Sequence, residues 1–364
     1  MIIHKINLEN FRNICSAEIF PSVGVNILFG KNAQGKTNFL ESIYFSATSR
    51  SHRGSRDKDL ICIGSEAAKI RLDIRGVWGE NEIYTEIGKS GKKIFINRTQ
   101  ARKLGELYGF VYVAMFSPED LQLVKAGPQL RRRFMDMELC QIYPSYYHSL
   151  RMYYKILKQR NNLLKTVYRN RDQMELIPIF DRQLVDAGQK IISYRKKYIS
   201  AIEKYAANIA SEITNGIEEL VLTYKNNVGA EDFEEKLTKH REQDISRGAT
   251  SVGIHKDDIS FRINGRDGRD FASQGQQRTA ALSLKLASVS HIVCEKKEQP
   301  IILLDDVLSE LDAARQEYLM MNISKSQVFI TLTGGSATLD MLESHIIENK
   351  NVLFVEDGKF TERN

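Results

Sequence analysis

The chain has 364 residues, of which 42% are hydrophobic and 27% charged, so it is long enough for two domains and is not expected to be disordered. Lysine and arginine outnumber aspartate and glutamate by 52 to 46, a balance that permits an anionic partner without requiring one. The four cysteines lie far apart and form no CxxC pair, which argues against a zinc site and a disulfide framework and favours a reducing compartment.

The chain shows no sign of membrane insertion or secretion. No stretch reaches the roughly 18 consecutive apolar residues of a membrane helix. The N-terminal "MIIHKINLENFRNI" alternates instead of forming the apolar block of a signal peptide. The sequence therefore predicts a cytoplasmic protein.

Three zones follow one another along the chain. Residues 1–116 are predicted to be mainly strands, because short β-branched and aromatic runs alternate with Gly and Asn breaks, and one helix follows residue 36. Residues 117–247 carry long helical patterns rich in Tyr, Leu, Arg and Lys. Residues 248–364 alternate strands and helices as α/β folds do. We predict a split α/β domain, residues 1–116 and 248–364, with a basic helical insert domain, residues 117–247.

A phosphate-binding loop is predicted at residues 30–37. The stretch "ILFGKNAQGKTNFL" places an apolar strand before the GxxxxGK[ST] pattern and a helix after it. Backbone N–H groups of such a loop surround a β-phosphate, its lysine reaches the β- and γ-phosphates, and its hydroxyl ligates Mg²⁺. The alternative is a glycine-rich turn without nucleotide. The predicted ATP-binding residues here are Gly30, Lys31, Asn32, Ala33, Gln34, Gly35, Lys36 and Thr37, with Lys36 also catalytic.

A pair of acids follows a second apolar strand. In "PIILLDDVLSELD" the carboxylates of Asp305 and Asp306 are expected at the carboxyl end of a buried strand. Asp305 would hold Mg²⁺ together with Thr37, and Asp306 would orient or deprotonate the attacking water. P-loop enzymes more commonly carry Glu at the second place, so we expect slow turnover. The alternative is that the two acids cap a following helix.

The stretch "FASQGQQRTAALSLKL" carries unusual polarity at the start of a helix pattern. A helix N-terminus offers unpaired N–H groups and the positive end of the dipole, so Gly275 could bring backbone close to an anion while Ser273 and glutamines donate to it. The plainer alternative is an ordinary N-cap by Ser273. The residues here that could contact an anion are Ser273, Gln274, Gly275 and Gln276.

Together, the three motifs resemble those of ABC-type ATPases, and "SQGQQ" is similar to their signature motif. The resemblance narrows to the RecF family of DNA replication and repair proteins, which are ABC-type, SMC-like P-loop ATPases. It spans nearly the whole chain, in order, through the segments "LENFRN", "GKNAQGKTNFLESIY", "SHRGSRDKDLI", "FSPEDLQLVKAGPQLRRRFMD", "GIHKDDISFRING", "SQGQQRT" and "LLDDVLSELD".

The chain departs from the family at a few positions. Ile254 stands where the family usually has Pro, and Lys256 where it usually has Arg. No Q-loop glutamine is placed, and "TLTGG" takes the place of a switch histidine. Thr331 or Thr333 is the candidate γ-phosphate sensor in that place.

The resemblance implies a fold and a function. The fold is an α/β ABC-type ATPase head, with a P-loop parallel sheet, antiparallel strands and an inserted helical domain. The implied function is that of a weak, DNA-dependent ATPase in DNA repair, replication, recombination and the SOS response. Its ATP- and Mg²⁺-bound homodimer would bind single-stranded and duplex DNA at gap junctions and help load a recombinase with RecO- and RecR-type mediators.

The resemblance also assigns roles to individual residues. It implies that Ser273, Gln274, Gly275 and Gln276 bind ATP. The signature of one subunit would complete the nucleotide site of another, so Ser273 and Gly275 would act in trans. The stretch "SELD" at 309–312 resembles the D-loop. Arg12 would touch the nucleotide, with an ordinary surface arginine as the alternative.

The helical zone holds most of the excess positive charge. Residues 131–197 contain 15 Lys or Arg and 6 Asp or Glu, a local net charge of +9 that exceeds the +6 of the chain. Such a composition suits phosphate contacts without base reading, and a solvated helix surface is the alternative. A second basic loop, residues 50–58, has a DNA or nucleotide role or is a plain turn. The predicted DNA-contacting residues are Arg131, Arg132, Arg133, Lys155, Lys158, Arg160, Arg169, Arg171, Arg195, Lys196 and Lys197.

Two other functions compete with this one. The ATPase subunit of a membrane importer would need a compact helical segment between its motifs, which the basic insert does not supply. An SMC-like structural head would need hundreds of heptad residues there, far more than the insert contains.

Overall fold

A computed structural model describes residues 1–77, 79–169, 171–333 and 349–362. The chain divides into two compact units, one formed by residues 1–120 and 288–364 and the other by residues 121–287. The first boundary lies near the predicted one. Residues 248–287, which were predicted to belong to the ATPase head, instead fall in the second unit, because β10 (Asp258–Ile263) pairs with β9 (Leu220–Lys225) of the helical zone.

An antiparallel sheet forms one layer of the first unit. Its strand order is β2-β1-β4-β5-β6-β7. The alternation of buried and exposed residues along the long strands β1 and β4 matches the period-two pattern of the sequence. The strands are β1 Ile2–Phe11, β2 Ile14–Ile19, β4 Ala67–Gly76, β5 Gly79–Gly88, β6 Gly91–Ile96 and β7 Thr99–Gln100.

A second sheet carries the phosphate-loop strand. Its order is β15-β14-β3-β13-β12-β8, and all its pairs are parallel except that of β15 with β14. Strands β12 and β13 are buried at every residue, as expected for the middle of a parallel sheet. The strands are β3 Val25–Phe29, β8 Val113–Phe116, β12 Ile301–Asp305, β13 Val328–Leu332, β14 Lys350–Glu356 and β15 Lys359–Glu362.

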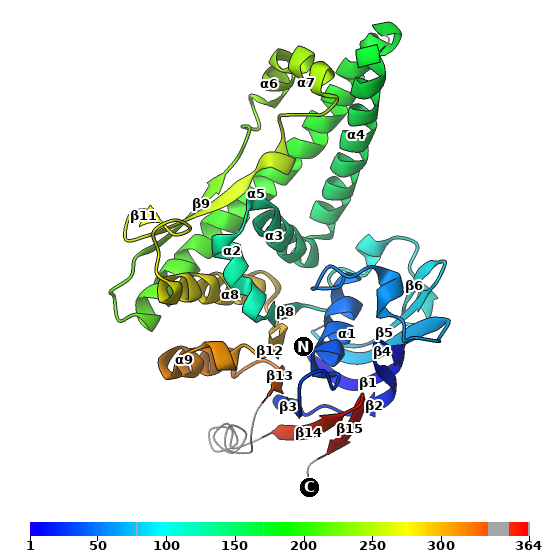
Figure 1. Cartoon of the computed structure of the whole chain (residues 1–364), viewed down its shortest axis with the longest axis vertical. Coiled ribbons are helices and arrows are strands. Elements are labelled where there is room, and N and C mark those ends of the chain that lie inside the picture. The colour runs from blue at the N-terminus through cyan, green and yellow to red at the C-terminus, as the bar shows by residue number, and fades with distance from the viewer. Residues whose placement is uncertain (78, 170, 334–348, 363–364) are drawn as a thin grey trace. The chain divides into compact units, whose positions relative to one another are not determined.

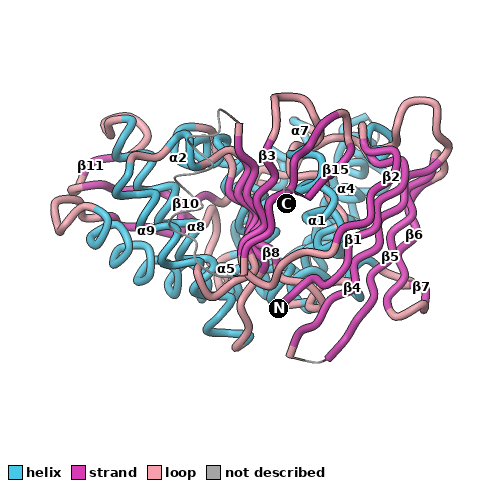
Figure 2. The backbone as a smooth tube through the Cα atoms, turned by 90° about the horizontal axis from the view of Figure 1, so that it is seen from below, coloured by secondary structure: helices cyan, strands magenta, loops and turns pink. Residues whose placement is uncertain are grey.

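Helix α1 (Lys36–Thr48) lies between the two sheets (Figure 2). Its Phe39 ring packs against Phe329 of β13 at 6.0 Å and against Phe360 of β15 at 5.1 Å between centroids. Residues of both sheets and of α1 form one continuous apolar core. This core holds the start of α1 at the carboxyl edge of the parallel sheet. The unit also contains α9 (Ala313–Ile323) and short 3-10 turns at Asp57–Leu60, Leu104–Glu106 and Leu308–Glu310.

The second unit is mainly helical. Its long helices α4 (Pro144–Arg169) and α5 (Ile177–Ile213) run side by side (Figure 1). The small sheet β11-β10-β9 packs on α5, and its strand β9 lies in the zone where the sequence predicts long helices and no strand was named. Helix α8 (Gln274–Lys296) begins in this unit. The remaining elements are α2 Gln122–Lys125, α3 Pro128–Ile142, α6 Phe233–Lys239, α7 Arg241–Arg247, β11 Arg266–Asp267 and 3-10 turns at Arg171–Leu176 and Ile254–Lys256. A further 3-10 turn, Pro118–Leu121, spans the boundary between the two units in the sequence.

The predicted fold class is confirmed: an α/β head with a P-loop parallel sheet, antiparallel strands and a helical insertion. Within the described part of the chain, no helix is both long and apolar enough to cross a membrane.

Candidate nucleotide site

The predicted phosphate loop joins β3 to α1 at the carboxyl edge of the parallel sheet. Two of its glycines are required by geometry. A Cβ at Gly30 would lie 2.3 Å from the Val355 carbonyl oxygen. Gly35 has φ of +116°, a region that L side chains rarely adopt, and is the N-cap of α1. The backbone therefore needs glycine at both ends of the loop, as the motif predicts.

Lys36 lies across this loop. Its Nζ donates hydrogen bonds to the carbonyl oxygens of Gly30 at 2.7 Å and Lys31 at 2.6 Å. Burial lowers the pKa of Lys36, and the nearby carboxylates of Asp306 and Asp305 oppose that shift. The Lys36 ammonium is thus held by carbonyl groups of the phosphate loop and lies close enough to Asp305 and Asp306 to feel their charge.

Thr37 and Asp305 meet although 268 positions separate them in the sequence. The Thr37 Oγ1 donates to Asp305 Oδ1 at 2.7 Å, and Thr331 Oγ1 donates to the same oxygen at 2.9 Å. Asp305 is buried, which raises its pKa, and these two hydrogen bonds act in the opposite direction. A hydroxyl and a carboxylate oxygen side by side at a phosphate loop are the donor set that Mg²⁺ prefers.

Asp306 lies beside this pair in a constrained conformation. Its φ is +53°, in the left-handed region. Its N–H donates to Thr331 Oγ1 at 2.9 Å, and its Oδ1 accepts from Thr333 Oγ1 at 3.0 Å. Neither Asp305 nor Asp306 caps the helical turn that follows, which was the alternative, because the 3-10 turn at Leu308–Glu310 has Val307 as its N-cap and no side-chain cap bond. The acid that caps a helix nearby is Asp312 of "SELD", which accepts from Arg315 N.

The outer part of the loop is tied to the turn between β14 and β15. Gln34 Oε1 accepts from Asp357 N at 2.7 Å, and the Gln34 carbonyl accepts from Gly358 N at 2.9 Å. Asn13 Nδ2 donates to the Ala33 carbonyl at 3.5 Å. The sequence reasoning did not predict any of these loop supports. The "DG" pair at 357–358 is a hairpin-turn signal that predicts the turn but not its neighbour.

Arg12 and the basic loop 50–58 are joined to α1. Arg12 Nε donates to the buried carboxylate of Glu41 at 3.0 Å, and its Nη2 donates to Ser55 Oγ at 2.6 Å. Ser51 Oγ also donates to Glu41, and Arg53 donates to Asn38 Oδ1 at 3.3 Å. These contacts order the loop. A nucleotide contact by Arg12 and a DNA role for the loop stay predictions.

Ser273 caps α8 in the second unit. Gln276 N donates to Ser273 Oγ at 3.2 Å, and Ser273 N donates to Gln276 Oε1 at 3.0 Å, which is a reciprocal capping box. In a single chain, therefore, Ser273 acts as an ordinary helix N-cap, which was the plainer alternative. Ser273 and Gln274 are exposed, and the first turn of α8 begins at Gln274. It stays a prediction that this stretch binds the nucleotide of a second subunit through Ser273, Gln274, Gly275 and Gln276.

Buried arginines and exposed lysines in the second unit

Arg131 and Arg195 were predicted to contact DNA, and the structure contradicts this. Arg195 is fully buried, and its guanidinium donates to Asp257 Oδ2 at 2.7 Å and Asp136 Oδ1 at 2.8 Å. Arg131 is 4% exposed and donates to both carboxylate oxygens of Asp258 at 2.6 and 2.9 Å. Each guanidinium forms ion pairs with carboxylates of its own unit, so neither is available to a DNA phosphate.

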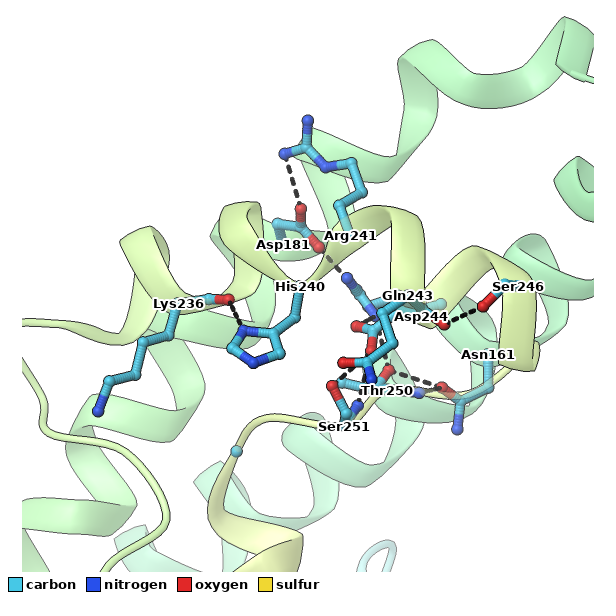
Figure 3. Close-up of polar contacts among 12 residues, drawn as sticks. Asn161, Asp181, Lys236, His240, Arg241, Gln243, Asp244, Ser246, Thr250 and Ser251 are labelled. Atoms are coloured by element: carbon cyan, nitrogen blue, oxygen red, sulfur yellow. Dashed lines mark hydrogen bonds and ion pairs between the residues drawn. The ribbon is translucent and has the colours of Figure 1, made fainter.

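The structure also contradicts the predicted DNA contact of Arg160. It is fully buried on α4, and its guanidinium donates to Asp181 at 2.6 Å and to Asp244 at 2.8 Å. Figure 3 shows how these acids are held: Asp181 also accepts from Arg241, and Asp244 accepts from Ser251. Breaking one partner of such a buried pair leaves an uncompensated charge, so the cluster is structural.

The remaining members of the predicted set differ in exposure. Arg132 donates to the Asp257 carbonyl at 2.6 Å and is half-buried, as is Arg133. The side chain of Arg169 lies outside the described residues. The members that are exposed on the helical unit are Lys155, Lys158, Arg171, Lys196 and Lys197.

Comparison with known proteins

The fold and the site define a class. A P-loop that joins a parallel-sheet strand to a helix, with an acidic strand end contacting its threonine, is typical of ATPase heads of the ABC and SMC type. The capped start of α8 has the sequence of a signature-like motif. The family model described as RecF/RecN/SMC N terminal domain matches residues 2–352. A solved SMC head from Pyrococcus furiosus has a TM-score of 0.56 at 16% identity over 100% of this chain and 96% of its own, a likeness in fold alone.

Closer relatives narrow the class to one family. A protein of Lachnoclostridium phytofermentans named DNA replication and repair protein RecF is 43% identical, covering 98% of this chain and 99% of its own. A protein of the same name from Clostridium botulinum strain Alaska E43 is 44% identical, covering 99% of each. A solved structure of RecF with ATP, described as a recombination mediator of the RecFOR pathway, has a TM-score of 0.92 at 34% identity, covering 100% of this chain and 97% of its own. The chain belongs to the RecF family.

Proposed function

We propose that this chain is a DNA replication and repair ATPase that acts in the cytoplasm as an ATP-dependent switch. In its ATP-bound form it dimerises, binds DNA at gaps and helps load a recombinase in recombinational repair and replication restart, together with RecO- and RecR-type mediators. The observation that carries the proposal is the 2.7 Å contact between Thr37 and Asp305, which joins the phosphate loop to the acidic strand. The names of the relatives support the pathway.

The residues of the site divide the work of ATP hydrolysis. The loop N–H groups and Lys36 would bind the phosphates. Thr37 and Asp305 would hold a Mg²⁺ ion, which would neutralise charge that develops on the phosphates. Asp306 would orient the attacking water and accept its proton. An Asp is one methylene shorter than the usual Glu and is held by Thr333, so we expect slow turnover.

Exposed lysines of the helical unit support DNA binding through the phosphate backbone. Lys155 and Lys158 lie three residues apart on α4, so they share one face of that helix. Lys196 and Lys197 add two exposed charges on α5. Contacts of this kind carry no base specificity. Binding is therefore expected to depend on the shape of the DNA and on salt more than on its sequence.

The test measures binding to gapped, duplex and single-stranded DNA with and without ATP, in the parent and in Lys36→Ala. The parent is expected to dimerise with ATP and to bind DNA more tightly as a dimer. Lys36→Ala is expected to lose nucleotide binding, and with it both effects. Unchanged ATP-induced dimers of Lys36→Ala in light scattering would contradict the assignment of the phosphate loop.

A further inference from the structure

Thr331 of β13 and Thr333, just beyond the end of that strand, face the acids at the end of β12. The two strands are parallel, and Asp305 is the register partner of Thr331. Thr333 follows two residues later, one position beyond the end of β13. Thr331 is 2% exposed, so bulk water does not compete with its protein contacts.

The Thr331 hydroxyl bridges the two acids. It donates its one proton to Asp305 Oδ1 at 2.9 Å and accepts a proton from Asp306 N at 2.9 Å. Thr333 Oγ1 donates to Asp306 Oδ1 at 3.0 Å. One side chain therefore fixes the carboxylate of Asp305 and the backbone of Asp306, while its neighbour fixes the carboxylate of Asp306.

These contacts bear on two features of the acids. Asp306 has φ of +53°, in the left-handed region, and the hydrogen bond from its N–H to Thr331 Oγ1 fixes its backbone there. Asp305 shares the oxygen that Thr331 contacts with Thr37 of the phosphate loop. In this arrangement both hydroxyl protons already go to carboxylates, which leaves neither threonine a proton to donate to a γ-phosphate.

We propose that Thr331 is a positioning residue for ATP hydrolysis: its hydroxyl locks Asp305 and Asp306 into one geometry, with Thr333 as a second support for the Asp306 carboxylate. The inference rests on the proposed function for its consequence in catalysis. The hydrogen bonds themselves belong to the chain and can be measured without nucleotide.

The test compares Thr331→Val, which keeps the shape of the side chain without the hydroxyl, with Thr331→Ser, which keeps the hydroxyl. Thr331→Val is expected to lower kcat for ATP roughly 10- to 100-fold, the usual effect of losing a group that orients a metal-binding carboxylate, with a much smaller change in KM. Thr331→Ser is expected to retain most of the parent kcat. Parent-like kcat in Thr331→Val would overturn the proposal.

A second readout uses the nucleotide-free protein. Amide hydrogen exchange at Asp306, measured residue by residue, is expected to be faster in Thr331→Val than in the parent and in Thr331→Ser. Thr333→Val is the matched control: it should lower kcat while leaving exchange of the Asp306 amide unchanged. Unchanged exchange in Thr331→Val would overturn the bridge even if kcat fell.

The two readouts separate this inference from the proposed function. If the parent neither bound nor hydrolysed ATP, the proposed function would fail, and the Asp306 exchange rates would still decide whether Thr331 holds the two acids together. If the parent hydrolysed ATP and Thr331→Val did so equally well, only the positioning role would fail.

Discussion

At the scale of single residues, the division of labour between Asp305 and Asp306 leads to a sharp expectation. Asp305 contacts Thr37, whereas Asp306 has no contact with the loop hydroxyl and is held by Thr333. Asp306→Asn is therefore expected to retain ATP and Mg²⁺ while cleavage slows by roughly 10²- to 10⁴-fold, the usual contribution of a general base. Phosphate release in single-turnover experiments, together with nucleotide titrations, measures both quantities.

Asp357→Asn is the matched control for this prediction. Asp357 is an exposed acid at the turn behind the phosphate loop, with φ of +46°, a conformation that Asn tolerates well. Asp357→Asn removes one negative charge, as Asp306→Asn does, and is expected to leave ATP hydrolysis unchanged. Normal turnover in Asp306→Asn would show that another group serves as the base.

The sequence predicted the residues that a local motif contains. The spacing from Gly30 to Thr37 predicts a phosphate loop, and four apolar residues before Asp305 predict a buried strand end. It did not predict the bridge made by Thr331, because that contact depends on which strand pairs with β12 and in which register. The tether from Gln34 to the turn at 357–358 was missed for the same reason, since more than 300 positions separate the partners.

At the scale of elements, the arginines of α4 and α5 show how a charge count misleads. Arg195 follows Ile191 and Ile192 and precedes Ile199 at helical spacing, so it lies on the buried face of α5. Arg160 likewise has Ile156 four residues before it on α4. This periodicity was available in the sequence and could have separated the buried arginines from Lys196 and Lys197. Their acidic partners, in other elements, could not have been predicted.

Neighbouring residues of α5 allow the two roles to be separated. Arg195→Gln removes one side of a buried ion-pair cluster and is expected to lower the free energy of unfolding by about 3–5 kcal/mol. Lys196→Gln with Lys197→Gln is expected to leave it nearly unchanged, because both side chains are exposed. Denaturant titrations of the three proteins measure the difference.

The same double lysine variant tests the DNA surface. For duplex DNA, each lost phosphate contact is expected to flatten the slope of log K against log salt concentration by about 0.9. Identical slopes in the variant and the parent would place the DNA elsewhere, for instance on loop 50–58.

Equal stability of Arg195→Gln and the parent would contradict the structural role of the buried arginine.

At the scale of the whole molecule, we expect the signature motif to act on the nucleotide of a second subunit. Within one chain Ser273 forms a capping box with Gln276, and this role accounts for a serine at the start of α8 without any nucleotide. The same exposed helix start also offers a hydroxyl and N–H groups to an anion on another subunit. Both readings fit the sequence, since Ser is favoured for either purpose, so an experiment on mixed subunits is needed.

Two variants with separate lesions provide that experiment. Ser273→Arg would obstruct an interface at the signature while leaving its own phosphate loop intact, and Lys36→Ala would lose ATP while keeping a good signature. Neither is expected to dimerise alone when ATP is added. Replacing the cap costs about 1 kcal/mol, so thermal melting of Ser273→Arg checks that the variant stays folded.

If the signature acts in trans, a mixture of the two variants contains heterodimers with one whole site, made of the loop of the Ser273→Arg subunit and the signature of the Lys36→Ala subunit. The other site carries both lesions. Light scattering is therefore expected to show ATP-dependent association in the mixture that neither variant shows alone. A chain carrying both substitutions, mixed with Ser273→Arg, offers no whole site and should not associate. Parent-like dimerisation and hydrolysis by Ser273→Arg alone would leave the stretch as a helix cap, and failure of the mixture alone would mean that both sites must close together.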